Sequence, residues 1–324
     1  MKSRKRPFKK DILNHCYQRS ADGGVIFYSQ LDHLVWFTSI CVAARKYDVQ
    51  ILAMCPMPDH VHISARAASA RDLSGFMGKY SHDFALEYNR ICRKSGPVFQ
   101  HPFGSAPKYG AKKGRANLIY IGNNLVERQL ARYAEEARWS LVAYAVSDHP
   151  FSEPLVPRTA RRPMQRAVKE VLSCRKEDIP LRYRQLQRIF TPLTAVEKQQ
   201  LTDFIISRYN AIDYPAALEF FDGNYEQFLL ALHSNTGSEY DLNEVFLGKT
   251  DKPYAQMTKI LLKEKGFKDI HEFLTLDNPE KYELFLLLRK HTNAMAKQIA
   301  RYLHLPIKEI GPEDNYLYGT YPFD

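Results

Sequence analysis

Apolar and polar residues follow two different periods in the first 150 residues of the chain. Alternation or a short apolar run bounded by Gly or Pro is typical of a strand, whereas apolar residues three and four apart are typical of a helix. The resulting order is strand, helix, strand, strand, helix, which predicts an α+β domain with a ferredoxin-like antiparallel sheet and helices. The five segments are 12–18, 29–47, 49–55, 60–66 and 71–92.

The pattern becomes helical almost throughout after residue 150. A proline-bearing stretch at 148–154 and an arginine-rich linker at 158–166 separate the two halves. We therefore predict two domains, 1–150 and 151–324, the second an all-α extension. Residues 284–310 resemble a helix-turn-helix with a truncated reading helix, and a purely structural bundle is the equal alternative. The predicted helices of the extension are 164–174, 194–211, 214–221, 224–234, 254–265, 279–290 and 293–304.

Charge and cysteine content narrow the class of protein. Residues 1–150 hold 22 Lys and Arg against 12 Asp and Glu, while 151–324 hold 24 of each, so the net charge of +10 lies entirely in the first half. A basic domain suits a phosphate backbone, and a solvated lysine-rich surface is the alternative. Five scattered cysteines without a Cys-x-x-Cys pair indicate a reducing cytoplasm. We expect no membrane association and no secretory signal, because no apolar run approaches roughly 18 residues and Met1–Pro7 is charged.

The candidate chemistry lies in Met57-Pro58-Asp59-His60-Val61-His62-Ile63. On a strand, alternate side chains share a face, so His60 and His62 project together. Two neighbouring imidazoles can hold one metal ion, and a packed or solvated histidine is the alternative. By the same alternation, Asp59 is expected on the opposite face, away from the pair.

This stretch resembles the HUH motif of the single-tyrosine HUH transposases, especially the REP-associated tyrosine transposases, in which it reads Met-Pro-(Asn or Asp)-His-(Val or Ile)-His. Residues 96–100 resemble the family strand that precedes the catalytic helix, and residues 116–126 resemble the segment that carries the nucleophile. Tyr120 takes the place of that tyrosine. Trp139 and Ser140 are similar to the pair that closes the family domain. The resemblance covers roughly residues 7–145 and implies the HUH endonuclease fold.

Two positions depart from the family segment. Gly122 stands where the family has His, and Leu125 stands where it has Pro. The chain also contains 20 tyrosines, most of which must pack or face solvent. The alternative nucleophiles are Tyr109, Tyr133 and Tyr80.

The resemblance implies a mechanism and a set of ligands. A divalent ion, Mg²⁺ or Mn²⁺, would be held by His60, His62 and the amide of Asn124, which shares a helix face with Tyr120 because the two are four residues apart. Tyr120 would attack the scissile phosphate and leave a 5′-phosphotyrosine. His15 is expected near the pair.

The resemblance also implies partners. The substrate would be single-stranded DNA, free or folded into a hairpin, and the enzyme would be a homodimer. Residues 104–115 are expected to form a mobile loop that contacts DNA through its basic side chains. Those side chains are Lys108, Lys112, Lys113 and Arg115.

Two other classes of function remain open. A catalytically inactive, domesticated DNA-binding protein derived from such a transposase is favoured by Gly122 and by the long extension. A metal-dependent hydrolase would use His60 and His62 with a water nucleophile. It would still cleave DNA after Tyr120→Phe.

Overall fold

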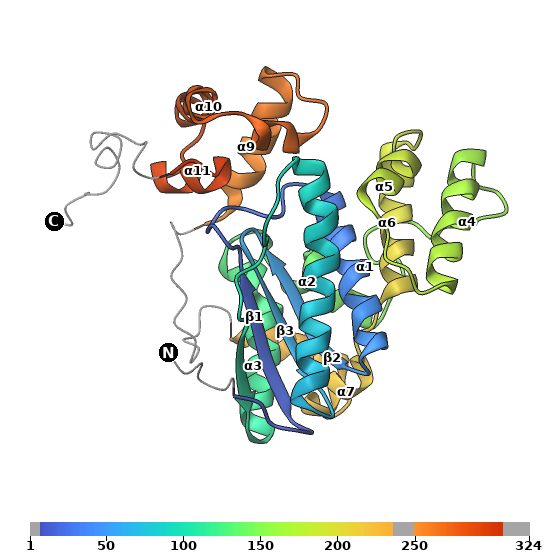
Figure 1. Ribbon diagram of the computed structural model, residues 1–324. Helices are drawn as coiled ribbons and strands as arrows, with labels where there is room; N and C mark the ends of the chain where they lie inside the picture. Colours follow the sequence, from blue (N-terminus) through green and yellow to red (C-terminus); the bar gives the residue numbers. More distant parts are fainter. Residues whose placement is uncertain (1–6, 236–247, 249, 307–324) are drawn as a thin grey trace.

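A four-stranded antiparallel sheet forms the centre of the protein (Figure 1), and residues 7–235, 248 and 250–306 are described by this computed structural model. Its strands are β1 (Leu13–Arg19), β2 (Gln50–Met57), β3 (His60–Arg66) and β4 (Gly104–Lys108). They lie in the order β2-β3-β1-β4, with every neighbouring pair antiparallel. This is the ferredoxin-like arrangement that the sequence predicts.

The strand that carries the histidine pair is an inner strand. His62 lies opposite Tyr17 of β1 and opposite Cys55 of β2. Pairing on both sides fixes the register, and a fixed register fixes which side chains face each layer. The two histidines are therefore held on a strand that cannot slip.

Helices cover both faces of this sheet. The helices α1 (Gln30–Lys46) and α2 (Ala70–Cys92) lie side by side on one face, and α3 (Gly110–Glu127) lies on the other (Figure 1). Ser29 and Ser69 cap α1 and α2 by accepting the backbone N–H three residues later. The predicted α+β class is confirmed.

The prediction that residues 104–115 form a loop is wrong. Residues 104–108 form β4, which pairs with β1 along the sheet edge, and α3 begins at Gly110. Residues 96–100 are not the fourth strand either, since only an isolated bridge joins Phe99 to Ser20. Glycine and lysine content indicated a loop, but pairing with the open edge of β1 supplies backbone hydrogen bonds that override this local preference.

The remainder of the described chain is helical, as predicted. Each predicted helix is present to within a few residues, while the helix at Tyr183–Phe190 and the 3₁₀ turn at Ile270–Thr275 were not predicted. Short 3₁₀ turns, η1 (Ala134–Glu136), η2 (Arg138–Ser140) and η3 (Val142–Ala145), precede the extension. The extension comprises α4 (Arg162–Lys176), α5 (Tyr183–Phe190), α6 (Ala195–Tyr209), α7 (Tyr214–Leu218), η4 (Glu219–Phe221), α8 (Tyr225–Ser234), α9 (Lys252–Glu264), η5 (Ile270–Thr275), α10 (Asn278–His291) and α11 (Ala296–Leu303).

One hydrophobic core runs through both halves of the chain. It includes Trp36 of α1 and Phe84 of α2 together with Ile205 of α6 and Phe285 of α10. The division into domains 1–150 and 151–324 stays a prediction.

The helices α10 and α11 match the start of the predicted helix-turn-helix, but the stretch that would form its reading helix, 307–310, lies outside the described residues.

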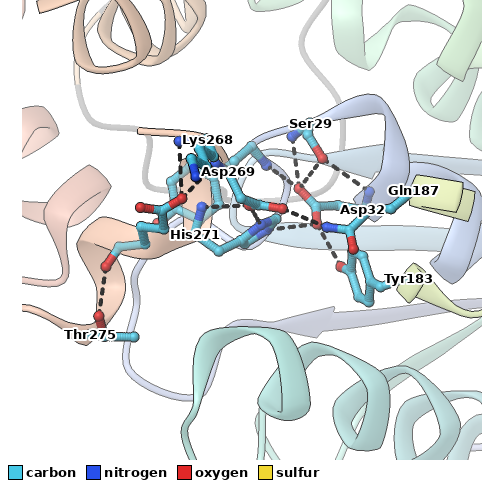
Figure 2. A network of polar contacts seen from close by, with 10 residues as sticks. Ser29, Asp32, Tyr183, Gln187, Lys268, Asp269, His271 and Thr275 are labelled. Atoms are coloured by element: carbon cyan, nitrogen blue, oxygen red, sulfur yellow. Dashed lines mark hydrogen bonds and ion pairs between the residues drawn. The ribbon is translucent and has the colours of Figure 1, made fainter. Parts of the chain in front are cut away.

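A buried polar network joins the N-terminus of α1 to the extension (Figure 2). His271 of η5 lies between two carboxylates, with Nε2 2.8 Å from Asp32 and Nδ1 2.5 Å from Asp269. The Tyr183 hydroxyl on α5 donates to Asp32 at 2.5 Å, and Gln187 donates to Asp269 at 2.7 Å. Burial alone would lower the pKa of His271, but the two carboxylates outweigh it and raise the pKa to about 10. Burial opposes ionisation of Asp32, yet its contacts with His271 hold the pKa of Asp32 below the usual value.

The position of His271 predicts an alkaline loss of stability. Because its folded pKa of about 10 exceeds the unfolded value of 6.5, its contribution is complete below pH 6.5 and is lost as pH rises towards 10. The free energy of unfolding should fall by about 4 kcal/mol across that window. Urea unfolding at pH 6, 8 and 10 measures the slope. A His271→Gln variant should be less stable at pH 6 and show a flatter profile, and an unchanged slope would contradict the assignment.

Candidate active site

Polar side chains of β3 face a polar stripe on α3. Ser64 donates its hydroxyl to Asn117 at 2.7 Å, and the ring of His62 lies 5.4 Å from the ring of Tyr120, centroid to centroid. Ser64 of β3 therefore contacts Asn117 of α3, and His62, two residues earlier on the strand, contacts Tyr120, three residues later on the helix. The next strand position on this face is His60, and the next position on the helix stripe is Asn124.

Three imidazoles and one phenol gather at this point. The rings of His60 and His62 are 4.8 Å apart and perpendicular, and the ring of His15 on β1 is 5.7 Å from that of Tyr120. All four side chains are buried, and Tyr120 is only 7% exposed. The expectation that His15 lies near the pair is confirmed, since its Nε2 is 3.0 Å from Nδ1 of His62.

Asp59 contacts the pair, contrary to the expectation that it points away. Its Oδ1 lies 2.6 Å from Nδ1 of His60. Asp59 belongs to the turn between β2 and β3 and not to the strand, so the alternation of strand side chains does not apply to it. Burial opposes its ionisation, but the contact with His60 and the charge of Arg301 keep the pKa of Asp59 below its usual value. In the sequence, the position of Asp59 between Pro58 and His60, in a predicted turn, was the signal that could have indicated this contact.

The two histidine rings are oriented through their Nδ1 atoms. Nδ1 of His60 faces Asp59 and Nδ1 of His62 faces His15, so Nε2, on the other side of each ring, is the nitrogen that would bind a metal. A metal-binding histidine commonly donates its other N–H to a carboxylate or another acceptor, which fixes the ring. The donor set therefore fits two-imidazole coordination.

The third ligand of the proposed metal site would be an amide. Within the described ranges, no group of three or more His, Cys, Asp or Glu side chains is arranged to hold a metal ion. An amide would complete the set, and Asn124 is buried with its Nδ2 lacking a hydrogen-bond partner among the described residues. Because amide oxygen and nitrogen exchange by a simple flip, this group fits the role of an oxygen ligand.

The alternative tyrosines occupy other places. Tyr80 is buried in α2, on the face of the sheet opposite to α3, and donates its hydroxyl to Gln18 of β1. Tyr109 precedes α3 and is 60% exposed, and Tyr133 packs its ring 4.5 Å from that of His233. Of the four candidates, Tyr120 is the one with described ring contacts to His15 and His62.

The predicted DNA-binding residues lie around the start of α3. Lys112 and Lys113 are exposed in its first turn, and Lys108 ends β4. Arg115 is also exposed, but its Nε donates to the backbone oxygen of Phe220 at 2.8 Å. Their proposed contact with DNA stays a prediction.

Packing by the extension explains the glycine at position 122. A Cβ atom there would lie 2.7 Å from Leu232 of α8, and Asn123 donates to the backbone oxygen of Leu232 at 2.8 Å. A side chain at this position would require the end of the Leu232 side chain to move, so the histidine of the family segment would disturb the packing of α8 against α3. Leu125 belongs to a small core with Tyr120, Cys55 and Met57, where an apolar side chain is required.

Comparison with known families supports the arrangement in the sheet layer. Residues 26–114 match the family model described as "Transposase IS200 like". This part of the chain is therefore similar to the IS200-like transposases. The matched segment contains both His60 and His62, and it ends within the first turns of α3, before Tyr120.

Two other comparisons give less information about the chain. A solved structure titled "Structure of the REP associates tyrosine transposase bound to a REP hairpin" is similar over 45% of this chain and 86% of its own, with 16% identity and a TM-score of 0.39. No curated protein matches the chain. Within the described part of the chain, no helix is both long and apolar enough to cross a membrane.

Proposed function

We propose that this protein is a transposase that nicks and rejoins single-stranded DNA, free or folded into a hairpin, through a covalent bond to Tyr120. The observation that carries the proposal is the meeting of Tyr120 with His62 and His15, at ring distances of 5.4 and 5.7 Å. The phenol and the imidazoles belong to one chain, so the arrangement needs no side chain from a second subunit. A homodimer remains part of the proposal on the ground of family resemblance alone.

His60, His62 and Asn124 would hold a divalent ion, Mg²⁺ or Mn²⁺. When bound, such an ion polarises a phosphate oxygen and stabilises the charge that develops there. Asp59 orients His60 and His15 orients His62, so the two rings present fixed nitrogens. Because the hydroxyl of Tyr120 is buried, binding of DNA must also uncover it.

The proposed reaction conserves the energy of the phosphodiester bond. The oxygen of Tyr120 loses its proton and attacks the phosphorus, the P–O3′ bond breaks, and the departing 3′-oxygen takes up a proton. This leaves a 5′-phosphotyrosine and a free 3′-hydroxyl. A second 3′-hydroxyl can then displace Tyr120 and join strands without a nucleotide cofactor.

Two contacts disfavour the hydrolase alternative. A water nucleophile needs a base, and Asp59 is the carboxylate in contact with the pair. Both of its oxygens are engaged, Oδ1 by His60 and Oδ2 by Arg301, each at 2.6 Å. Asp59 is therefore placed to hold a ring rather than to take a proton from water.

Detection of the covalent adduct tests the proposal. The full-length protein is incubated with labelled single-stranded oligonucleotides from the flanks of its own gene, with Mn²⁺, Mg²⁺ or EDTA. We expect a label that stays with the protein in denaturing gels, requires the metal ion and maps to the peptide containing residue 120. Binding of these oligonucleotides without an adduct in Mn²⁺ would instead indicate the inactive DNA-binding protein.

A further inference from the structure

The last helices of the described chain reach the candidate active site from one end of the sheet. Figure 1 shows α9, α10 and α11 together beyond the tips of the inner strands. We call residues 250–305 the C-terminal clamp. Two buried or partly buried ion pairs connect it to the two elements that carry the candidate chemistry.

The first ion pair reaches the histidine strand. Arg301 of α11 places Nη1 2.6 Å from Oδ2 of Asp59, whose other oxygen contacts His60. The same turn is held from a second side, because the backbone N–H groups of Ile26 and Phe27 both donate to the oxygen of Pro58. The Arg301 side chain is 27% exposed, so its contact with Asp59 is partly shielded from water.

The second ion pair reaches the tyrosine helix. Arg128 directly follows α3 and binds both oxygens of Asp251, with Nη2 at 2.8 Å and Nε at 3.1 Å. Its backbone oxygen also accepts from Thr250 and from the N–H of Asp251. Both side chains are at most 9% exposed, and a two-pronged arginine contact of this kind fixes orientation as well as distance.

A hydrogen bond inside the clamp joins the two ion pairs. Gln298 lies one turn before Arg301 on α11 and donates to the backbone oxygen of Thr250 at 2.9 Å. A continuous series of polar contacts therefore runs from His60 through Asp59 and α11 to the end of the tyrosine helix. His60 and Tyr120 are 60 residues apart in sequence, and the clamp links the strand of one to the helix of the other.

We propose that the C-terminal clamp sets the geometry of the nuclease centre, with Arg301 and Arg128 as positioning residues. Arg301 would hold Asp59, and through it the ring of His60, in the orientation that binds a metal ion. Arg128 would hold the end of α3 so that Tyr120 faces the histidines. This inference rests on the proposed function, because it concerns the same metal and the same tyrosine.

Metal affinity without DNA tests the first half. Binding of Mn²⁺ to the full-length protein is followed by electron paramagnetic resonance of the free ion. Arg301→Ala should weaken the affinity about 10- to 100-fold, as loss of an outer contact to a ligand does, and Arg301→Lys should recover part of it. His304→Ala is the matched control, because His304 docks the same helix through Asp22 and Val25 without touching Asp59, and its affinity should stay within about twofold of wild type.

Adduct formation tests the second half. Arg128→Lys keeps the charge but loses the two-pronged contact, so the rate of adduct formation should fall about tenfold. Asp251→Asn, with its fold checked by circular dichroism, should act in the same direction. A wild-type adduct rate in both variants would overturn this half.

Several outcomes separate the clamp from the proposed function. Wild-type Mn²⁺ affinity in Arg301→Ala, or equal loss in His304→Ala, would overturn the role of Arg301 while leaving the chemistry of Tyr120 in place. Failure of the wild type to bind Mn²⁺ would overturn it as well. A third outcome is that the wild type binds Mn²⁺, Arg301→Ala binds it more weakly, and no adduct forms under any condition. That outcome would support the link to His60 and reject the proposed reaction.

Discussion

Tyr120→Phe is expected to reduce covalent adduct formation by at least about three orders of magnitude, because the variant lacks the attacking oxygen. Phenylalanine keeps the ring that packs against His62, His15 and the small core of Cys55 and Met57. The free energy of unfolding should therefore fall by only about 1 kcal/mol. Gel assays of adduct and of cleaved oligonucleotide, run side by side, measure the two products separately.

Tyr133→Phe is the matched control for this substitution. Tyr133 packs against His233 rather than against the histidine pair, so the variant should form the adduct at the wild-type rate. Cleavage that survives Tyr120→Phe without an adduct would favour a water nucleophile. An adduct that survives would move the nucleophile to another tyrosine.

Asp32→Asn is expected to lower the free energy of unfolding by about 3–5 kcal/mol, because it leaves the charge of His271 in a fully buried site with one carboxylate fewer. Asp32 is completely buried and lies against His271 and Tyr183. It also accepts the backbone N–H groups of Tyr28 and Ser29, at 2.8 and 2.7 Å, at the start of α1. Urea or thermal unfolding at pH 6 measures the change.

Asp83→Asn provides the comparison for an ordinary surface ion pair. Asp83 pairs with Lys79 one turn earlier on α2, where both side chains are partly exposed, so its loss should cost less than about 1 kcal/mol. Similar losses in the two variants would show that the buried network contributes no more than a surface pair. The network would then be a by-product of packing rather than a source of stability.

Local periodicity predicted most of the secondary structure. The helices α1, α2, α6, α8 and α10 follow apolar spacing and clear N-caps, so their bounds lie within a few residues of the prediction. Short elements without such spacing were missed, as with α5 and η5. β4 was misread because Gly104–Lys108 has few strand-forming residues, and its backbone pairing with β1 comes from the rest of the sheet.

The sequence by itself determined that His60 and His62 share one strand face and that Tyr120 and Asn124 share one helix face, because backbone periods of 2 and 3.6 residues act within a segment. Family resemblance suggested that these two faces meet. Only the tertiary structure decided that Asp59 and His15 contact the pair, that Leu232 of α8 packs beside Gly122, and that Arg301 reaches Asp59 from 242 residues away. Contacts of this kind depend on turn geometry and on the path of the chain between distant segments, and neither is encoded in a local period.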